Sequence, residues 1–181
     1  DRLRRGYLLY TGLLRTSLAT QIPSVTLKDV LTPTCAEHFA IAADAHLVLG
    51  HIPPRVYSCD APDRGEKNVA AALRRLARMV CADLEEIGPE SAMEIARQFW
   101  EAQRDRIRAA ADRVAGECGA DRVVIAGIGS SLLARELGGL DLARELGQET
   151  GLQVTFVPMG YDGLYDALIS GQIDVILSSY P

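Results

Sequence analysis

Residues 122–131, Arg-Val-Val-Ile-Ala-Gly-Ile-Gly-Ser-Ser, carry the pattern that decides the fold class. The continuous apolar, β-branched run 122–126 is typical of a buried parallel strand. The glycines after it predict a tight turn, and the residues from Leu132 onward predict a helix. A strand, a glycine turn and a helix in this order indicate an α/β fold.

The C-terminal residues continue this alternation. Residues 154–157 and 173–177 predict strands, and residues 163–170 predict a helix between them. We therefore expect a short strand–helix–strand tail that packs against the strand near residue 124.

The residues before the strand are mainly helical in pattern. Apolar residues at steps of three and four predict one helix over 66–87, which Gly88-Pro89 ends. A capping box at Ser91 begins a second helix that ends near Cys118, and the two predict a helical hairpin. A similar box at Thr34 predicts a helix that Gly50 ends. Residues 21–33 predict a hairpin or a crossing loop.

Composition excludes several classes of protein. Apolar residues make up 48% and charged residues 24% of the 181 residues, close to globular averages, which excludes wholesale disorder, collagen and coiled coils. The formal net charge is −5 with no basic cluster beyond residue 5, so we expect no nucleic-acid partner. No apolar run predicts a membrane span and no signal-peptide pattern opens the chain, so we expect a cytoplasmic location.

Four cysteines stand far apart, at positions 35, 59, 81 and 118. None forms a CxxC pair and no histidine stands at zinc-finger spacing, so we expect no structural metal. An even number permits disulfides, but we expect reduced and mostly buried thiols, as in cytosolic proteins.

Two glycines and a serine between the predicted strand and helix form a candidate phosphate site. Gly127 and Gly129 let the backbone approach a ligand, and Ser130 opens a helix whose free N–H groups attract a phosphate. The third glycine of a dinucleotide fingerprint is replaced by Leu132. A tight turn with Ser130 as its N-cap explains the same residues, so both interpretations stay open.

Glu37 and Asp44 are seven residues apart, which places them on one face of the helix expected from Thr34. Such a pair suits acid–base catalysis or a divalent cation. Alternatively, Glu37 caps the helix and Asp44 is solvated, as carboxylates mostly are. We do not predict a metal site from His38 and His46.

Asp60, Asp63 and Arg64 lie in a loop just before a predicted helix. Loops held by rigid elements carry function disproportionately, which makes these residues candidates for a site. Turn chemistry, with Asp63 as a helix cap, is the alternative.

Thr11, Gly12 and Arg15 form a second candidate group near the start of the chain. Small polar residues beside a guanidinium suit an anion, or they make a turn.

These residues occur in an order and spacing that resembles one family. It is the hydantoinase/oxoprolinase-related protein of tetrahydromethanopterin-linked one-carbon metabolism, whose archaeal members include the methanofuran-biosynthesis synthase. The resemblance covers about residues 1–138 and is carried by residues 1–6, Tyr10-Thr-Gly12, Arg15-Thr16, residues 37–40, Asp44, Leu49-Gly50, residues 60–65 and residues 75–83. One departure is Asp60-Ala-Pro-Asp63-Arg-Gly, where the family usually has Thr-Ala-Asp-Gly-Arg.

The resemblance implies a sugar-kinase/actin-type fold with two ribonuclease-H-like halves. This chain would begin after the first half, and residues 123–130 would be the second half's strand and nucleotide-side turn. The archaeal synthase joins an aminomethylfuran diphosphate to γ-glutamyltyramine and releases diphosphate, and methylotrophic bacteria carry homologues for a related cofactor. The resemblance raises Glu37, Asp44, Asp60 and Asp63 to candidate catalytic residues. We expect Glu37, Asp44 and Asp60 to line one polar site with Arg15.

Residues 139–181 resemble something else, the first lobe of the solute-binding proteins of amino-acid ABC transporters. The two resemblances meet where Leu-Ala-Arg-Glu-Leu-Gly occurs twice, at 133–138 and 142–147. We therefore predict two domains, 1–138 and 139–181, as in a fusion, a chimeric gene or a designed chain. No arginine follows Gly151 to pair with a carboxylate, so we expect no tight amino-acid binding by the tail.

The resemblance favours a transferase-type enzyme of methanofuran-type cofactor synthesis, acting on a small molecule in a diphosphate-releasing or ATP-linked step. A truncated solute-binding module and an inactive fragment are the alternatives. The cofactor is open, with Mg²⁺ bound to a diphosphate or ATP as one option. We expect little turnover by this chain alone, because a missing N-terminal half or a second copy would complete the site. The candidate substrate or phosphate ligands are Thr11, Gly12, Arg15, Arg64, Gly127, Gly129 and Ser130.

Overall fold

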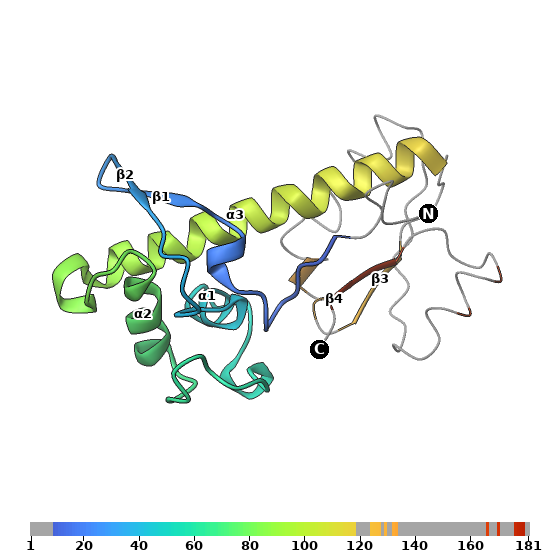
Figure 1. Cartoon of the computed structure of the whole chain (residues 1–181). Helices are drawn as coiled ribbons and strands as arrows, with labels where there is room; N and C mark the ends of the chain where they lie inside the picture. The colour runs from blue at the N-terminus through green and yellow to red at the C-terminus, as the bar shows by residue number, and fades with distance from the viewer. Residues whose placement is uncertain are drawn as a thin grey trace. The chain divides into compact units, whose positions relative to one another are not determined.

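The structure is a computed structural model that describes residues 9–118, 124–127, 129, 132–133, 166, 170 and 176–179. The helices and strands of these residues are shown in Figure 1. In chain order they are the 3₁₀ helix η1 (Leu18–Thr20), β1 (Ser24–Leu27), β2 (Val30–Pro33), α1 (Ala42–Val48), the 3₁₀ helix η2 (Pro54–Val56), α2 (Val69–Arg78), α3 (Leu84–Cys118), β3 (Val124–Gly127) and β4 (Ile176–Ser179).

The expected mixture of helices and strands is confirmed, including a parallel strand pair. Strand β3 pairs with β4 in parallel, with Val124 opposite Ile176 and Gly127 opposite Ser179. Residues 124–126 and 176–177 of the predicted strands are confirmed, and residues 122–123 and 173–175 lie outside the described residues. The strand expected at 154–157 lies outside the described residues, and so does most of the helix expected at 163–170. Among the described helices, none combines the length and hydrophobicity needed to cross a bilayer.

The chain divides into two compact units, and one of them comprises residues 12–103. This unit contains the β1–β2 hairpin, α1, α2 and the first part of α3. Its core joins residues of every one of these elements. The fully buried members include Leu18, Val25, Ala45, Leu76, Met79, Ile95 and Phe99. The other unit contains the remainder of α3 with β3 and β4.

Strands β1 and β2 form the hairpin that the sequence allows over 21–33. They pair antiparallel from Ser24–Pro33 to Leu27–Val30. Lys28 and Asp29 at the tip have positive φ angles of 49° and 65°, which a two-residue hairpin turn requires. Gln98 of α3 bonds both backbone groups of Thr26, at 2.8 and 2.7 Å, and so attaches the hairpin to the helix.

The helix expected from Thr34 is wrong in its start, since α1 begins only at Ala42. The Thr34 hydroxyl donates instead to the carbonyl of Ile22, so it is not free to cap a helix. Ile41 is the N-cap, and the Asp44 carboxylate accepts its N–H at 3.1 Å. Glu37 therefore lies in a loop, and Glu37 and Asp44 do not share a helix face.

The single helix expected over 66–87 is also wrong, because the chain turns between α2 and α3. Cys81 has a φ of 56° in this turn, a left-handed conformation that ends a helix. Val80, Leu84 and Ile87 still pack against the core, so the apolar period continues through the break. The sequence does signal the new start: Asp83-Leu-Glu-Glu86 is a capping pattern, and the Glu86 carboxylate accepts the Asp83 N–H at 2.8 Å.

Gly88 interrupts α3 close to its start. Its backbone has φ 79° and ψ 159°, a conformation that residues with a Cβ rarely adopt. A Cβ at Gly88 meets nothing within 4 Å, so the backbone alone decides the cost of a substitution.

We predict that Gly88→Ala lowers the free energy of unfolding by about 1–2 kcal/mol, because alanine is strained at this φ. Gly116→Ala is the matched control. Gly116 is a helical residue of α3 with the same open space, and alanine there should stabilise by about 0.5–1 kcal/mol. Urea unfolding of both variants measures the difference, and equal effects would contradict the argument.

Candidate functional site

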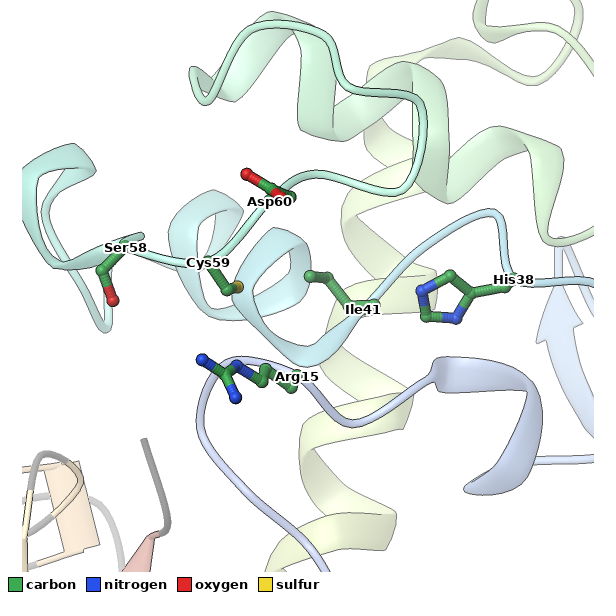
Figure 2. Close-up of a pocket in the computed structure, with 6 residues that line it drawn as sticks. All are labelled: Arg15, His38, Ile41, Ser58, Cys59 and Asp60. Carbon is green, nitrogen blue, oxygen red and sulfur yellow. The ribbon is translucent and has the colours of Figure 1, made fainter.

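A pocket of about 440 Å³ lies in the unit of residues 12–103. Figure 2 shows the six residues that line it: Arg15, His38, Ile41, Ser58, Cys59 and Asp60. They come from the turn before η1, the loop into α1 and the loop after η2. In this view the Arg15 and Asp60 side chains lie on opposite sides of Cys59. The pocket therefore combines a guanidinium, a carboxylate, an imidazole and a thiol.

The turn that carries Arg15 is fixed by the backbone of α1. The N–H groups of Ala42 and Ala43, in the first turn of the helix, donate to the carbonyls of Thr16 and Leu14 at 2.8 and 3.0 Å. The Gly12 N–H donates to the Thr16 hydroxyl at 2.7 Å and closes the turn. Leu14 is buried while Arg15 is exposed. Two N–H groups of the α1 terminus thus position the guanidinium.

A buried ion pair fixes the loop on the other side of the pocket. Asp44 of α1 and Arg75 of α2 both have fully buried side chains, and Arg75 Nη2 lies 2.8 Å from Asp44 Oδ1. Arg75 Nε and the Tyr57 hydroxyl also donate to this oxygen, each at 2.9 Å. The Asp44 carboxylate therefore connects α1 and α2 to Tyr57, the residue just before Ser58.

The same guanidinium holds the far end of the loop. Its Nη1 donates to Asp63 Oδ1 at 3.0 Å and its Nη2 donates to the Glu66 carbonyl at 3.1 Å. Asp63 Oδ1 also accepts the Gly65 N–H at 2.9 Å, which is an Asx turn. Residues 57–66 are therefore attached to the buried ion pair at both ends, to Asp44 through Tyr57 and to Arg75 through Asp63 and Glu66.

Burial and the neighbouring charges shift the pKa values of Asp44 and Arg75 in opposite directions. Burial raises the pKa of Asp44, while the hydrogen bond and charge of Arg75 and the Ile41 N–H lower it. Burial lowers the pKa of Arg75, but its hydrogen bond to Asp44 and the carboxylate charge outweigh this and raise it. Burial followed by the charge of Asp44 raises the pKa of Tyr57, which keeps its hydroxyl a donor.

A second network lies behind the Arg15 turn. The buried Gln103 of α3 donates from Nε2 to the Gly12 carbonyl at 3.0 Å. Its Oε1 lies 3.0 Å from His46 Nε2, and His46 Nδ1 lies 3.0 Å from His51 Nδ1. Since Oε1 can only accept, His46 carries its proton on Nε2 and accepts from His51. Burial, with the charge of His51, lowers the pKa of His46 to about 3, so its ring is neutral.

The structure brings together two of the four residues expected to share one polar site. Arg15 and Asp60 both line the pocket. Glu37 is exposed and does not line it. Asp44 is buried and bound to Arg75, so it is neither the solvated carboxylate nor a pocket residue.

The other candidates lie around the pocket or outside the description. Thr11 and Gly12 precede the Arg15 turn, and Arg64 is exposed with a φ of 56°. Asp63 supports its loop and does not cap the helix, because Asn68 is the N-cap of α2. Gly127 ends β3 and the Gly129 carbonyl accepts the Leu133 N–H at 2.9 Å, as in a strand-to-helix turn. Ser130 lies outside the described residues. The catalytic and binding roles of all these residues stay predictions.

Sequence reasoning missed His38, Ser58 and Cys59 in the pocket, and it missed Arg75, which supports the loop that carries Asp60. Arg75 had a signal that could have found it, since an arginine on the apolar face of a helix needs a buried partner. His38 had none, because it lies in a loop whose path the sequence does not predict. Within the described ranges, no three histidine, cysteine, aspartate or glutamate side chains converge as metal ligands would.

Comparison with known proteins gives the class to which this fold and pocket belong. Residues 32–154 match the protein family described as Hydantoinase/oxoprolinase. The chain belongs to this family. The match continues past residue 138, while the boundary predicted there stays a prediction.

Two relatives are more specific. The chain is 33% identical over 145 residues to a protein of Methanococcus vannielii named (4-{4-[2-(gamma-L-glutamylamino)ethyl]phenoxymethyl}furan-2-yl)methanamine synthase. It is 34% identical over 133 residues to a protein of the same name from Methanocaldococcus jannaschii. The alignments cover 80% and 74% of this chain, but only 65% and 40% of the relatives. These comparisons do not show the resemblance of residues 139–181 to solute-binding proteins.

We predict that Arg75→Gln lowers the free energy of unfolding by about 3–5 kcal/mol, because it leaves the Asp44 carboxylate buried without its charged partner. Arg78→Gln, on an exposed position of the same helix, should change it by less than about 0.5 kcal/mol. Urea unfolding measures both. Similar values for the two variants would contradict a structural role for the buried pair.

We predict that acid destabilises the protein through His46. The folded pKa is about 3 and the unfolded value about 6.5, so the unfolded chain binds an additional proton between these pH values. Stability is then complete above pH 6.5 and falls with decreasing pH, at up to about 1.4 kcal/mol per unit.

Unfolding curves between pH 4 and 7 test this for the wild type and His46→Gln. The variant should show a shallower loss toward low pH. His38→Gln is the control, since His38 is exposed, and it should keep the wild-type slope. An unchanged slope in His46→Gln would show that other groups cause the acid sensitivity.

Proposed function

We propose that this protein takes part in the synthesis of a methanofuran-type cofactor, as a transferase that joins an aminomethylfuran diphosphate to a tyramine derivative. The observation that carries the proposal is that Arg15 and Asp60 both line one pocket. The names of both relatives support it, because the compound they describe contains a furan, a methanamine and a phenoxymethyl ether.

The reaction forms one bond and breaks one. The phenol oxygen of the tyramine derivative bonds to the methylene carbon on the furan, and the carbon–oxygen bond to the diphosphate breaks. The electron pair leaves with the diphosphate and the phenol loses its proton. The site therefore needs a cationic group for the leaving group and an acceptor for the proton.

Arg15 supplies the cationic group in this proposal. Its guanidinium is exposed in the pocket, and its planar fork suits two phosphate oxygens. The turn beneath it is held by two backbone N–H groups of α1, which limits the rearrangement needed when the diphosphate binds.

Asp60 supplies the proton acceptor. Asp60 lines the same pocket as Arg15, and its loop is attached to Asp44 through Tyr57 and to Arg75 through Asp63. A divalent cation that accompanies the diphosphate would find in Asp60 the kind of oxygen ligand it prefers. A pocket of about 440 Å³ is in the range of small-molecule sites.

The roles that the sequence predicts for the remaining candidates are kept in the proposal. In a sugar-kinase/actin-type fold, the turn at Gly127, Gly129 and Ser130 would contact a phosphate, and Thr11, Gly12 and Arg64 would border the substrate. We keep both the fold assignment and these roles as part of the proposal. The chain spans 65% and 40% of the relatives' length, so the complete reaction is proposed for the protein and substrate binding for this chain.

Calorimetric titration of the 181-residue chain tests the proposal. The ligands are the aminomethylfuran diphosphate and the matching alcohol, which lacks the diphosphate. The diphosphate should bind at least tenfold more tightly than the alcohol, and Arg15→Gln should remove most of this difference. Arg74→Gln, an exposed arginine of α2 away from the pocket, should keep it.

Two results would contradict the proposal. Equal affinity for the diphosphate and the alcohol would exclude recognition of the leaving group. An equal loss of affinity in Arg15→Gln and Arg74→Gln would show only a general attraction of anions to basic side chains.

A further inference from the structure

Two cysteines outside the pocket lie against one another in the unit of residues 12–103. Cys35 follows β2 and is half-buried, and Cys81 lies in the turn between α2 and α3 and is exposed. Both thiols are free, and the pKa of Cys81 is raised by a hydrogen bond with Cys35, which indicates that the two side chains are neighbours. The expectation of mostly buried thiols is wrong for Cys35, Cys59 and Cys81, since two of them are half-buried and Cys81 is exposed.

The backbone holds the two cysteines in place. The Cys35 N–H donates to the carbonyl of Met79 at 2.7 Å, two residues before Cys81. Cys81 itself has a φ of 56°. It therefore belongs to the tight turn and not to either helix. The backbone therefore brings positions 35 and 81 close together.

The surroundings of the pair leave one sulfur open to a reagent. The Glu37 N–H donates to the Cys35 sulfur at 3.4 Å. The hydrogen bond to Cys35, followed by the charge of Cys35, raises the pKa of Cys81. Cys81 is exposed, so a reagent in solvent can reach its sulfur.

We propose that Cys35 and Cys81 are a redox modification site, which forms a reversible disulfide by exchange with a low-molecular-weight disulfide of the glutathione kind. One cysteine thiolate attacks the reagent, whose sulfur–sulfur bond breaks and releases one thiolate. The second cysteine thiolate then attacks the mixed disulfide, forms the Cys35–Cys81 bond and releases the second thiolate. The protein is oxidised by two electrons, the reagent is reduced to two thiols, and these take up the two protons.

The bond would connect the pocket to the turn between the helices. Cys35 stands three residues before His38, which lines the pocket. Oxidation would attach the start of this loop to the α2–α3 turn and would close a loop of about 45 residues. We therefore expect the oxidised protein to melt several degrees higher than the reduced one.

The test uses the full chain, reduced and then equilibrated with oxidised glutathione. Free thiols are counted after trapping and denaturation, and peptide mapping by mass spectrometry locates the bond. The wild type should lose two of its four thiols and gain a Cys35–Cys81 linkage that dithiothreitol reverses. Cys59→Ser is the matched control, since it removes a different free thiol, and it should form the same linkage.

Cys35→Ser and Cys81→Ser should each lose the linkage and the rise in melting temperature. A stable mixed disulfide on Cys81 in the wild type, with no intramolecular bond, would overturn the proposal. So would a bond mapped to Cys59 or Cys118, or four thiols that remain free at 10 mM oxidised glutathione, a large excess over protein thiol. This test does not depend on the proposed catalytic function.

Discussion

The buried contact between Asp44 and Arg75 is the interaction on which the pocket depends. It joins α1 to α2, and through Tyr57, Asp63 and the Glu66 carbonyl it holds both ends of the loop that carries Asp60. A buried charge pair stabilises little by itself, because each charge has lost its water. Its effect is specificity: only one arrangement of the two helices and the loop satisfies both charges.

The charged residues that support the pocket differ from the charged residues that line it. Asp44 and Arg75 are buried and engaged, whereas Arg15 and Asp60 are exposed on the segments that the buried groups support. Backbone N–H groups of α1 support the first segment and Arg75 supports the second. The chain belongs to the hydantoinase/oxoprolinase family. Catalysis in the proposed site would need charges that are held in place before the substrate binds.

The sequence predicts the class of the fold and part of the site, for identifiable reasons. The β-branched run before Gly127 predicts a parallel strand, because only a strand buried on both faces is apolar throughout. The helix from Thr34 fails, because its capping pattern is local while the Thr34 hydroxyl bonds Ile22, twelve residues earlier. The predicted position of Asp44 in the polar site is wrong for the same reason, since its buried partner Arg75 stands 31 positions away. Contacts of this range are not visible in local spacing.

A double-mutant cycle with Asp44→Asn, Arg75→Gln and the double variant tests the central claim most directly. Urea unfolding gives the free energy of each, and the coupling energy is the amount by which the double variant differs from the sum of the single ones. We predict a coupling of at least about 2 kcal/mol, because each single change leaves one buried charge without its partner. Additive effects, within about 0.5 kcal/mol, would show that the two residues act independently and would contradict the account.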